Sequence, residues 1–407
     1  MPDSLICAPV QGELLERYAQ LIAGTGANIQ ADQQVLVIAS PDAAPLVRAV
    51  AAACYARGAR FVDPWYFDPY VKRTRALEAD PDTLEFVPRW YRERLLDLGA
   101  AHGSRISISP NTPAGLMDDV DPAVAGRDQL PSLPEHFDVI NAKTTNWCVV
   151  PWATDAWARV AHPDLEPAEA RARLVDELVY VLRLDEDDPA AAWQERSRRL
   201  QDAGRKITEQ HFDSLRFVGP GTDLTVGLLP SSRFSGGGGT TVDGIEHISN
   251  LPTEEVFTSP DPQRADGVVT ATKPLDVSGT VLRNLQVRFE QGRVVSIDAE
   301  TGADALRARC AKDEGASRLG ELALVDREGR VGKTGTVFFN TLLDENAASH
   351  LALGNAYATA VDDEDRARIN ASTIHIDFMI GSDEVAVTGV KADGTEVPLL
   401  RGGSWQI

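Results

Sequence analysis

The alternation of apolar and polar positions changes character near the middle of the 407-residue chain. In the first half, a short apolar run rich in β-branched residues at 34–39 is followed by a segment with helical periodicity at 43–57. The same texture predicts a further helix at residues 84–98 and strands at residues 60–63, 105–109 and 137–140. Strands that alternate with helices predict a mostly parallel sheet with helices on both of its faces.

The second half has the period-two pattern of antiparallel strands. Helical periodicity extends over residues 166–212, with an acidic break at 185–189, and the pattern then changes. It predicts a helix at residues 303–312 and strands at residues 223–228, 281–289 and 294–297. We therefore predict an α/β fold class overall, with an N-terminal α/β domain at residues 1–215 and a C-terminal mixed α+β domain at residues 216–407 that carries the functional site.

The charge balance excludes several classes of partner. Forty basic and 61 acidic side chains give a formal net charge of −21. A chain this acidic repels nucleic acid and anionic membranes, so we predict neither as a partner. Solubility is the ordinary explanation of such acidity, although it is also compatible with a cationic substrate.

The cysteines and the apolar runs indicate the compartment. Four widely spaced cysteines form no C-x-x-C pair, which argues against a thiolate zinc site and against a disulfide scaffold. The N-terminus lacks a basic segment followed by an apolar run, and no apolar stretch is long enough to span a bilayer. We predict a cytoplasmic protein.

One strand-like segment carries the first sign of chemistry. Residues 374–380, with the sequence IHIDFMI, alternate as a half-buried strand does. The isoleucines and the phenylalanine share one face, so His375 and Asp377 lie together on the other. An imidazole and a carboxylate two residues apart on a rigid strand can bind one metal ion.

Other possible ligands also lie in the second half. Glu254 and Glu255 are adjacent, so in an extended backbone they point in opposite directions. Glu321 is at the head of an apolar strand, and His350 begins another apolar segment. Tyr357 follows His350 by seven residues, which is two turns if the segment is helical.

Each of these groups alone is more often structural, in a salt bridge or as a packed ring. Taken together, two histidines, three carboxylates and a tyrosine form an oxygen and nitrogen ligand set without sulfur. Such a set suits a hydrolytic site with two metal ions about 3.5–4 Å apart.

These residues carry a resemblance to a known family. Residues 250–260 (NLPTEEVFTSP), 344–354 (DENAASHLALG) and 374–381 (IHIDFMIG) resemble blocks of the thermophilic aminopeptidase family, the M29 metallopeptidases that include aminopeptidases T and S. The resemblance is specific in the second half and extends more weakly into the first half through residues 147–152 (WCVVPW).

The resemblance implies specific roles. It implies metal ligation by Glu255, Glu321, His350, His375 and Asp377. Tyr357 matches the active-site tyrosine, and Glu321 is the first candidate for the general base, with Glu255 next. The implied cofactors are two divalent cations, which zinc, cobalt or manganese can supply. The implied partners are peptides with a free N-terminus and a second copy of the chain in a homodimer.

Alternatives remain open at this stage. The same ligands suit a dinuclear hydrolase acting on another amide or an ester, or a non-catalytic binding protein that a metal stabilises. No H-E-x-x-H and no G-x-S-x-G motif occurs, which argues against zincins and α/β-hydrolases. Residues 236–239 are four glycines without a following Lys-Ser/Thr, so we predict a close-packed or flexible turn near the site and no phosphate loop.

Overall fold

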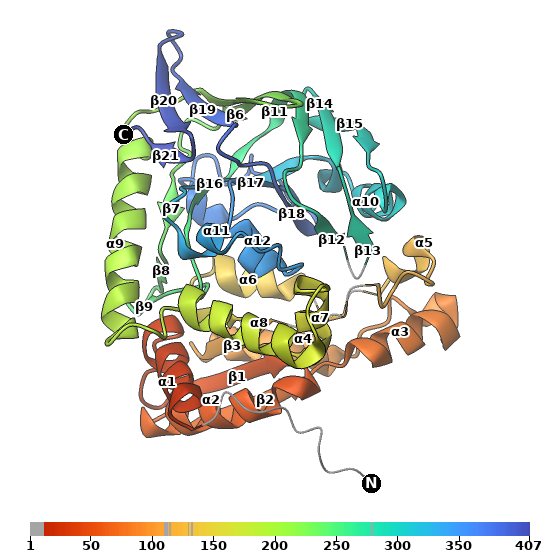
Figure 1. Cartoon of the computed structure of the whole chain (residues 1–407), viewed down its shortest axis with the longest axis vertical. Helices are drawn as coiled ribbons and strands as arrows, with labels where there is room; N and C mark the ends of the chain where they lie inside the picture. Colours follow the sequence, from red (N-terminus) through yellow and green to blue (C-terminus); the bar gives the residue numbers. More distant parts are fainter. Residues whose placement is uncertain (1–11, 110–112, 114, 129, 132, 278–279) are drawn as a thin grey trace.

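A parallel sheet and two antiparallel sheets form the framework of the protein (Figure 1). The structure is a computed structural model and describes residues 12–109, 113, 115–128, 130–131, 133–277 and 280–407. In Figure 1 the parallel sheet lies in the lower part of the view and the antiparallel sheets lie above it. The predicted fold, with a parallel α/β part followed by an antiparallel part with few helices, is confirmed.

The parallel sheet is built from the alternating elements of the first half. Its strand order is β2 (Phe61–Tyr66), β1 (Gln34–Ala39), β3 (Ser104–Ile108) and β4 (Asn146–Val150). Side chains of β1 pack on both faces, because Val35 and Val37 join one buried cluster and Leu36 joins another. The first cluster includes residues of α2 (Ala44–Ala56), and the second includes residues of α4 (Arg89–Ala100).

Two of the predicted elements in this half need correction. Residues 137–140 do not form a strand; they lie in helix α6 (Glu135–Asn141), and the strand of this region is β4. A four-residue apolar run fits either structure, and the acidic residues Glu135 and Asp138 in the first turn favour a helix start. The helix predicted at 84–98 begins only at Arg89, directly after Pro88.

The remaining helices of this half lie around the parallel sheet. They are α1 (Glu13–Leu21), which continues as a π-turn (Ile22–Gly26), α3 (Pro69–Glu78), α5 (Pro122–Ala125), α7 (Asp155–Ala161), α8 (Pro167–Val181) and α9 (Pro189–Thr208). The last two confirm the helical region and its acidic break. The Asp188 carboxylate accepts a hydrogen bond from the Ala191 amide (3.0 Å), which caps α9. Helix α9 runs along the side of the molecule from the parallel sheet to the antiparallel sheets (Figure 1).

The antiparallel half contains two sheets that pack face to face. The larger sheet has the order β15 (Arg293–Asp298), β14 (Gln286–Glu290), β11 (Pro260–Thr270), β6 (Thr222–Leu228), β5 (Ser214–Gly219), β19 (Ala386–Val390), β20 (Glu396–Arg401) and β21 (Ser404–Trp405). The smaller sheet has the order β18 (His375–Met379), β17 (His350–Gly354), β16 (Leu319–Val325), β10 (Glu255–Thr258) and β7 (Ser235–Gly236).

The short elements of this half fill the periphery. They are β8 (Gly239–Thr240), β9 (Glu246–His247), β12 (Leu275–Val277), β13 (Thr280–Leu282), α10 (Ala303–Cys310), α11 (Arg330–Thr334) and α12 (Thr341–Glu345). Helix α10 confirms the prediction at 303–312. The segment predicted as one strand at 281–289 is two strands, β13 and β14, because Asn284 turns the chain with a positive φ of 52°.

One face of the smaller sheet forms the core of the antiparallel half. Leu322, Leu324, Leu351 and Phe378 are all buried in a cluster that also contains side chains of the larger sheet, including Phe217. Because strand side chains alternate, the other face of the smaller sheet must point away from this core. That face turns towards the first half of the chain.

The segment that leads into β10 connects the two halves. The Val149 amide of β4 donates to the Ser249 carbonyl (2.7 Å), and the Leu251 amide donates to the Val149 carbonyl (3.0 Å). These hydrogen bonds attach residues 249–251 to the edge of the parallel sheet. The position of Glu255, four residues further on, is therefore tied to both sheets.

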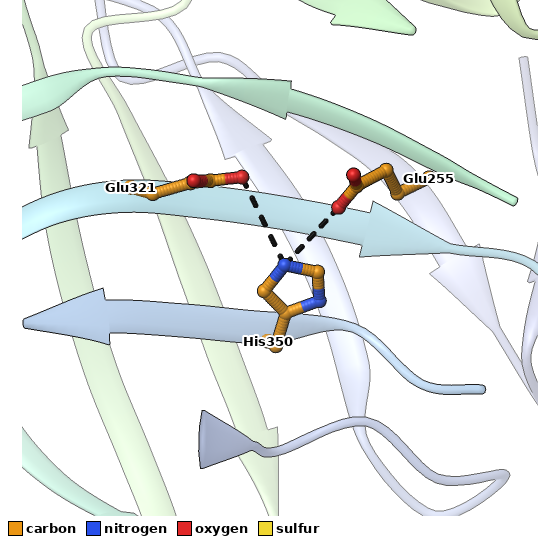
Figure 2. Close-up of side chains that lie close together, drawn as sticks. All are labelled: Glu255, Glu321 and His350. Carbon is orange, nitrogen blue, oxygen red and sulfur yellow. Dashed lines mark ion pairs between the residues drawn. The ribbon is translucent and has the colours of Figure 1, made fainter. Parts of the chain in front are cut away.

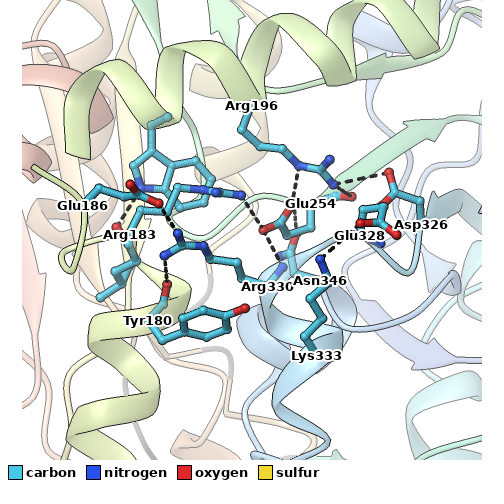
Figure 3. Close-up of polar contacts among 12 residues, drawn as sticks. Tyr180, Arg183, Glu186, Arg196, Glu254, Asp326, Glu328, Arg330, Lys333 and Asn346 are labelled. Atoms are coloured by element: carbon cyan, nitrogen blue, oxygen red, sulfur yellow. Dashed lines mark hydrogen bonds and ion pairs between the residues drawn. The ribbon is translucent and has the colours of Figure 1, made fainter. Parts of the chain in front are cut away.

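A buried ionic network adds a second connection between the halves (Figure 3). Glu254 is fully buried, pairs with Arg196 of α9, and lies 3.2 Å from Arg183 Nη2. Its Oε1 atom also accepts a hydrogen bond from the Arg330 amide (3.1 Å), and its own amide donates to Asn346 Oδ1 (2.6 Å). The Glu254 carboxylate is thus used in joining α9 to the antiparallel half.

Three of the four cysteines lie within the described residues. Cys54, Cys148 and Cys310 are free cysteines, and Cys7 lies outside the described residues. Among the helices of the described ranges, none combines the length and the apolar character that crossing a membrane requires.

Candidate metal centre

The outward face of the smaller sheet gathers the predicted ligands. Glu321 of β16 lies opposite Ala352 of β17, which in turn lies opposite Asp377 of β18. His350 lies opposite Ala323 in the same way, so all five side chains share one face of the sheet. The small side chains of Ala323 and Ala352 leave the space between the polar groups open. Figure 2 shows Glu255, Glu321 and His350 converging from three adjacent strands.

Two groups of three ligand atoms result from this arrangement. In the first, His350 Nε2 lies 3.1 Å from Glu255 Oε2 and 3.8 Å from Glu321 Oε1 (Figure 2). In the second, His375 Nε2 lies 3.3 Å from Glu321 Oε2 and 3.3 Å from Asp377 Oδ1. Within each group all the ligand atoms lie within 4.8 Å of one another. Glu321 belongs to both groups, with one oxygen directed to each.

The backbone orients both imidazoles towards the carboxylates. His375 Nδ1 lies 2.8 Å from the Asn355 carbonyl oxygen, and His350 Nδ1 lies 3.2 Å from the Ala348 carbonyl oxygen. A proton on Nδ1 is donated to the carbonyl, which leaves the Nε2 lone pair free for a metal ion. Histidines that bind metals are usually fixed in this way.

Burial and charge shift the pKa values of the carboxyl groups in opposite directions. Burial raises the pKa of Glu255, and repulsion from Glu321 and Asp377 adds to the effect. Burial would also raise the pKa of Glu321, but the neighbouring imidazoles of His350 and His375 outweigh it and lower the pKa to about 2. Glu321 is therefore ionised at neutral pH, as a metal ligand must be.

The charge distribution fits bound cations. Four carboxyl groups line the same cavity: Glu255, Glu321, Glu345 and Asp377. Glu255 Oε2 is buried and accepts no hydrogen bond from the described residues. A divalent cation would compensate both the crowding of carboxylates and the unsatisfied oxygen, and the oxygen and nitrogen donors suit zinc, cobalt or manganese.

Glu345, at the end of α12, was not predicted as part of the site. It lines the cavity and is half-buried, and its pKa is raised, first by desolvation and then by the charges of Asp377 and Glu255. The acidic residues that precede His350 in the sequence were the available signal. The sequence did not reveal whether Asp344 or Glu345 faces the ligands, because α12 spans only five residues and gives little periodicity.

Tyr357 lines the same cavity as the candidate ligands. It follows β17 in an extended conformation and lies outside any helix; its amide donates to Ser259 Oγ (3.2 Å), which donates back to the Tyr357 carbonyl (3.0 Å). Its ring centroid lies 5.4 Å from that of His375 and 5.7 Å from that of Phe257. Burial raises the pKa of the Tyr357 hydroxyl, so it stays protonated and can donate a hydrogen bond.

The cavity in front of the ligands has a volume of about 250 Å³ and is shared by the two halves. The first half contributes its outer wall through residues 140–147, including Lys143 and Trp147. The glycines at 236–239 form part of another wall. A Cβ atom on Gly236 would lie 2.5 Å from the Glu255 carbonyl oxygen, so this run is a close-packed turn.

Taken together, the fold and the site are those of a metallopeptidase. The family model described as thermophilic metalloprotease (M29) matches residues 11–405, and the chain belongs to this family. The predicted family is therefore confirmed.

Curated relatives and a solved structure resemble the chain over nearly its whole length. Aminopeptidase T of Thermus aquaticus is 40% identical over 404 residues, which cover 97% of this chain and 99% of the relative. Aminopeptidase 2 of Geobacillus stearothermophilus is 36% identical over 408 residues, covering 96% and 97% of the two chains. The structure of wild-type AmpT from Thermus thermophilus matches with a TM-score of 0.86 and 37% identity, and the match covers 97% of this chain and 99% of that one.

Proposed function

We propose that this metal-dependent aminopeptidase uses two divalent cations, held by Glu255, Glu321, His350, His375 and Asp377, to remove the N-terminal residue of a peptide. The observation that carries the proposal is the pair of three-residue groups that share Glu321. A carboxylate with one oxygen in each group suits a ligand that bridges two ions. When bound, such ions polarise the scissile carbonyl and lower the pKa of a water molecule to near neutrality.

Glu321 and Glu255 are suited to different roles. If both oxygens of Glu321 are engaged, neither is free to accept a proton. Glu255, the second candidate for the general base, approaches His350 through one oxygen, Oε2, so its other oxygen is available. Glu321 would hold a cation in each of the two groups, and we assign proton transfer from the attacking water to the leaving amine to Glu255.

Tyr357 is suited to stabilise the oxyanion. Its hydroxyl is protonated and its side chain lines the cavity with the ligands, so it can donate a hydrogen bond to the carbonyl oxygen as that atom gains charge.

Replacing Tyr357 with phenylalanine is expected to lower kcat by about 10²-fold, the range observed when one oxyanion donor is removed. The ring contacts with Phe257 and His375 are retained in this variant, so KM and the thermal midpoint should change little. Steady-state kinetics on an aminoacyl-anilide measures the effect. A rise in KM with an unchanged kcat would instead place the hydroxyl in substrate binding.

The substrate's free amino group explains cleavage at the end residue. The inner part of the cavity is lined by carboxyl groups, which attract an ammonium and disfavour a blocked, neutral N-terminus. The attraction of a free ammonium by these carboxyl groups favours an aminopeptidase. It disfavours a dinuclear hydrolase that acts on another amide or an ester, and it disfavours a non-catalytic binding protein.

A combined metal and substrate assay tests the function. We expect the purified protein to contain about two divalent ions per chain and to lose activity with a chelator. We also expect it to cleave free peptides at least 10²-fold faster than N-acetylated ones, since acetylation removes the cation that the carboxylates attract. Chelator-resistant cleavage, or equal cleavage of both substrates, would rule out the proposed mechanism.

The setting of the enzyme also belongs to this proposal. We propose that it acts in the cytoplasm as a homodimer on peptides with a free N-terminus. The free thiols support a reducing compartment, and closed symmetric dimers are the commonest oligomers. Sedimentation of the purified protein measures the dimer directly.

A further inference from the structure

One lysine stands out in a cavity that otherwise carries acidic groups. Lys143 is the single lysine or arginine among the described residues that line it, opposed to four carboxyl groups. It follows α6, which packs on the site through Phe137, whose ring centroid lies 6.2 Å from that of Tyr357. The cavity thus has carboxylates on the sheet side and an exposed lysine in its lining from the first half.

The Lys143 ammonium has no partner within the described ranges. It forms neither an ion pair nor a side-chain hydrogen bond there, although the chain has a large excess of acidic residues. Its backbone, in contrast, is fixed. The Lys143 amide donates to the Ile140 carbonyl (3.0 Å), and its carbonyl accepts from the Val242 amide (2.9 Å).

The backbone conformation at this position is one that glycine prefers. Lys143 follows the end of α6 with a φ of 55°, in the left-handed region where helices commonly end on glycine. A side chain is present here at a conformational cost. That observation is consistent with a role for the side chain in the cavity.

A second cation lies behind the same wall. The Arg105 guanidinium stacks over the Trp147 ring, 5.7 Å from its centroid, and Trp147 lines the cavity. Arg105 Nε is buried without a hydrogen-bond partner among the described residues. Burial lowers the pKa of Arg105 to about 10, so it remains protonated at neutral pH and makes this wall electropositive.

We propose that Lys143 binds the C-terminal carboxylate of the substrate, so that short peptides with a free carboxylate are preferred. This inference rests on the proposed function, which places the substrate's amino group against the carboxylates of the sheet. A short peptide carries opposite charges at its ends, and the cavity presents the complementary charges on opposite walls. Each residue adds at most about 3.6 Å of length, so a peptide longer than the span of the cavity would carry its carboxylate past Lys143.

Three leucyl substrates test the charge requirement. Leucyl-alanine has the terminal carboxylate, leucyl-alaninamide lacks its charge, and leucyl-p-nitroanilide has neither a second residue nor a carboxylate. The wild-type enzyme should prefer leucyl-alanine over its amide by about 10–100-fold in kcat/KM, the worth of a charge-assisted hydrogen bond, mostly through KM. Lys143→Gly should remove this preference, and Lys143→Arg should keep most of it.

The variants are chosen so that misfolding cannot imitate the result. Glycine suits the left-handed backbone at position 143, so Lys143→Gly should unfold at a temperature no lower than wild type. Gln291→Gly is the matched control, because Gln291 has a similar φ of 49°, is exposed and lies away from the cavity. Gln291→Gly should keep the wild-type preference for leucyl-alanine over its amide, and only Lys143→Gly should lose it.

The remaining outcomes separate the possible errors. If the anilide is not cleaved by any variant, the proposed function fails. If it is cleaved but wild type accepts leucyl-alanine and its amide equally, only the role of Lys143 is overturned. An acidic side chain is another source of a carboxylate. Wild type could prefer leucyl-glutamyl-amide over leucyl-glutaminyl-amide and show no preference for leucyl-alanine over its amide. If Lys143→Gly abolished that preference for the glutamyl side chain, the assignment to the C-terminal carboxylate would be overturned.

Discussion

Glu321→Gln is expected to lower kcat by at least about 10³-fold, a loss of about 4 kcal/mol in transition-state stabilisation. The substitution keeps the shape of the side chain but removes the charge shared by the two ligand groups. The amide has one weaker oxygen donor and one nitrogen that cannot bind a cation, so one metal position loses a ligand and the other loses charge. Metal content and single-substrate kinetics measure the two effects together.

The control for this variant is the same substitution on the surface. Glu396 lies on β20 with an exposed side chain, so Glu396→Gln should retain wild-type metal content and kcat. Circular dichroism should show the same secondary structure in both variants. An E321Q protein with two bound ions and normal turnover would contradict both the bridging role and the metal centre as we describe it.

Glu254→Ala is expected to destabilise the protein by about 3–5 kcal/mol, because it leaves two arginines in the interior without their shared carboxylate. Arg196 is 9% exposed and Arg183 14% exposed at the side chain, so water replaces the lost partner poorly. The Arg330 amide also loses its acceptor. Chemical denaturation followed by circular dichroism measures the change in the free energy of unfolding.

A second glutamate serves as the control that distinguishes a buried ion pair from an exposed one. Glu195 also lies on α9 and pairs with Arg198 and Arg199, but this contact is at the surface. Glu195→Ala should leave the denaturation midpoint unchanged, since solvent screens the pair. Equal midpoints for the Glu254 and Glu195 variants would show that the buried network in Figure 3 does not hold the halves together.

The parts of the site that the sequence revealed are those with strict local periodicity. Residues 375 and 377 lie on one face of β18 because strand side chains alternate, and the apolar residues between them fix which face is buried. The same rule separates Glu254 from Glu255. The first is used in the ionic network and the second lines the cavity, in agreement with the choice made from the sequence. The family resemblance then linked segments that periodicity alone treats as independent.

Other parts of the fold and the site could not be predicted, because they depend on tertiary contacts between segments distant in sequence. Residues 137–140 have the composition of a strand, but they form α6 because the next segment, Asn146–Val150, takes the place beside β3. The reading of His350 to Tyr357 as two helical turns is also replaced, since β17 pairs with strands on both sides. Glu345 and Lys143 enter the cavity only through tertiary packing. Their neighbours there include residues more than about two hundred positions away in sequence.

The division of the cavity between the two halves has a consequence for specificity. The groups that would carry out hydrolysis belong to a sandwich of paired strands, whereas the wall at 140–147 consists of the end of α6, a loop and the start of β4 in a separate sheet. Substitutions in that loop can alter which peptides are accepted without disturbing the strand register that aligns the ligands. Substrate preference can therefore change through substitutions in this loop while the ligand set on the strands stays the same.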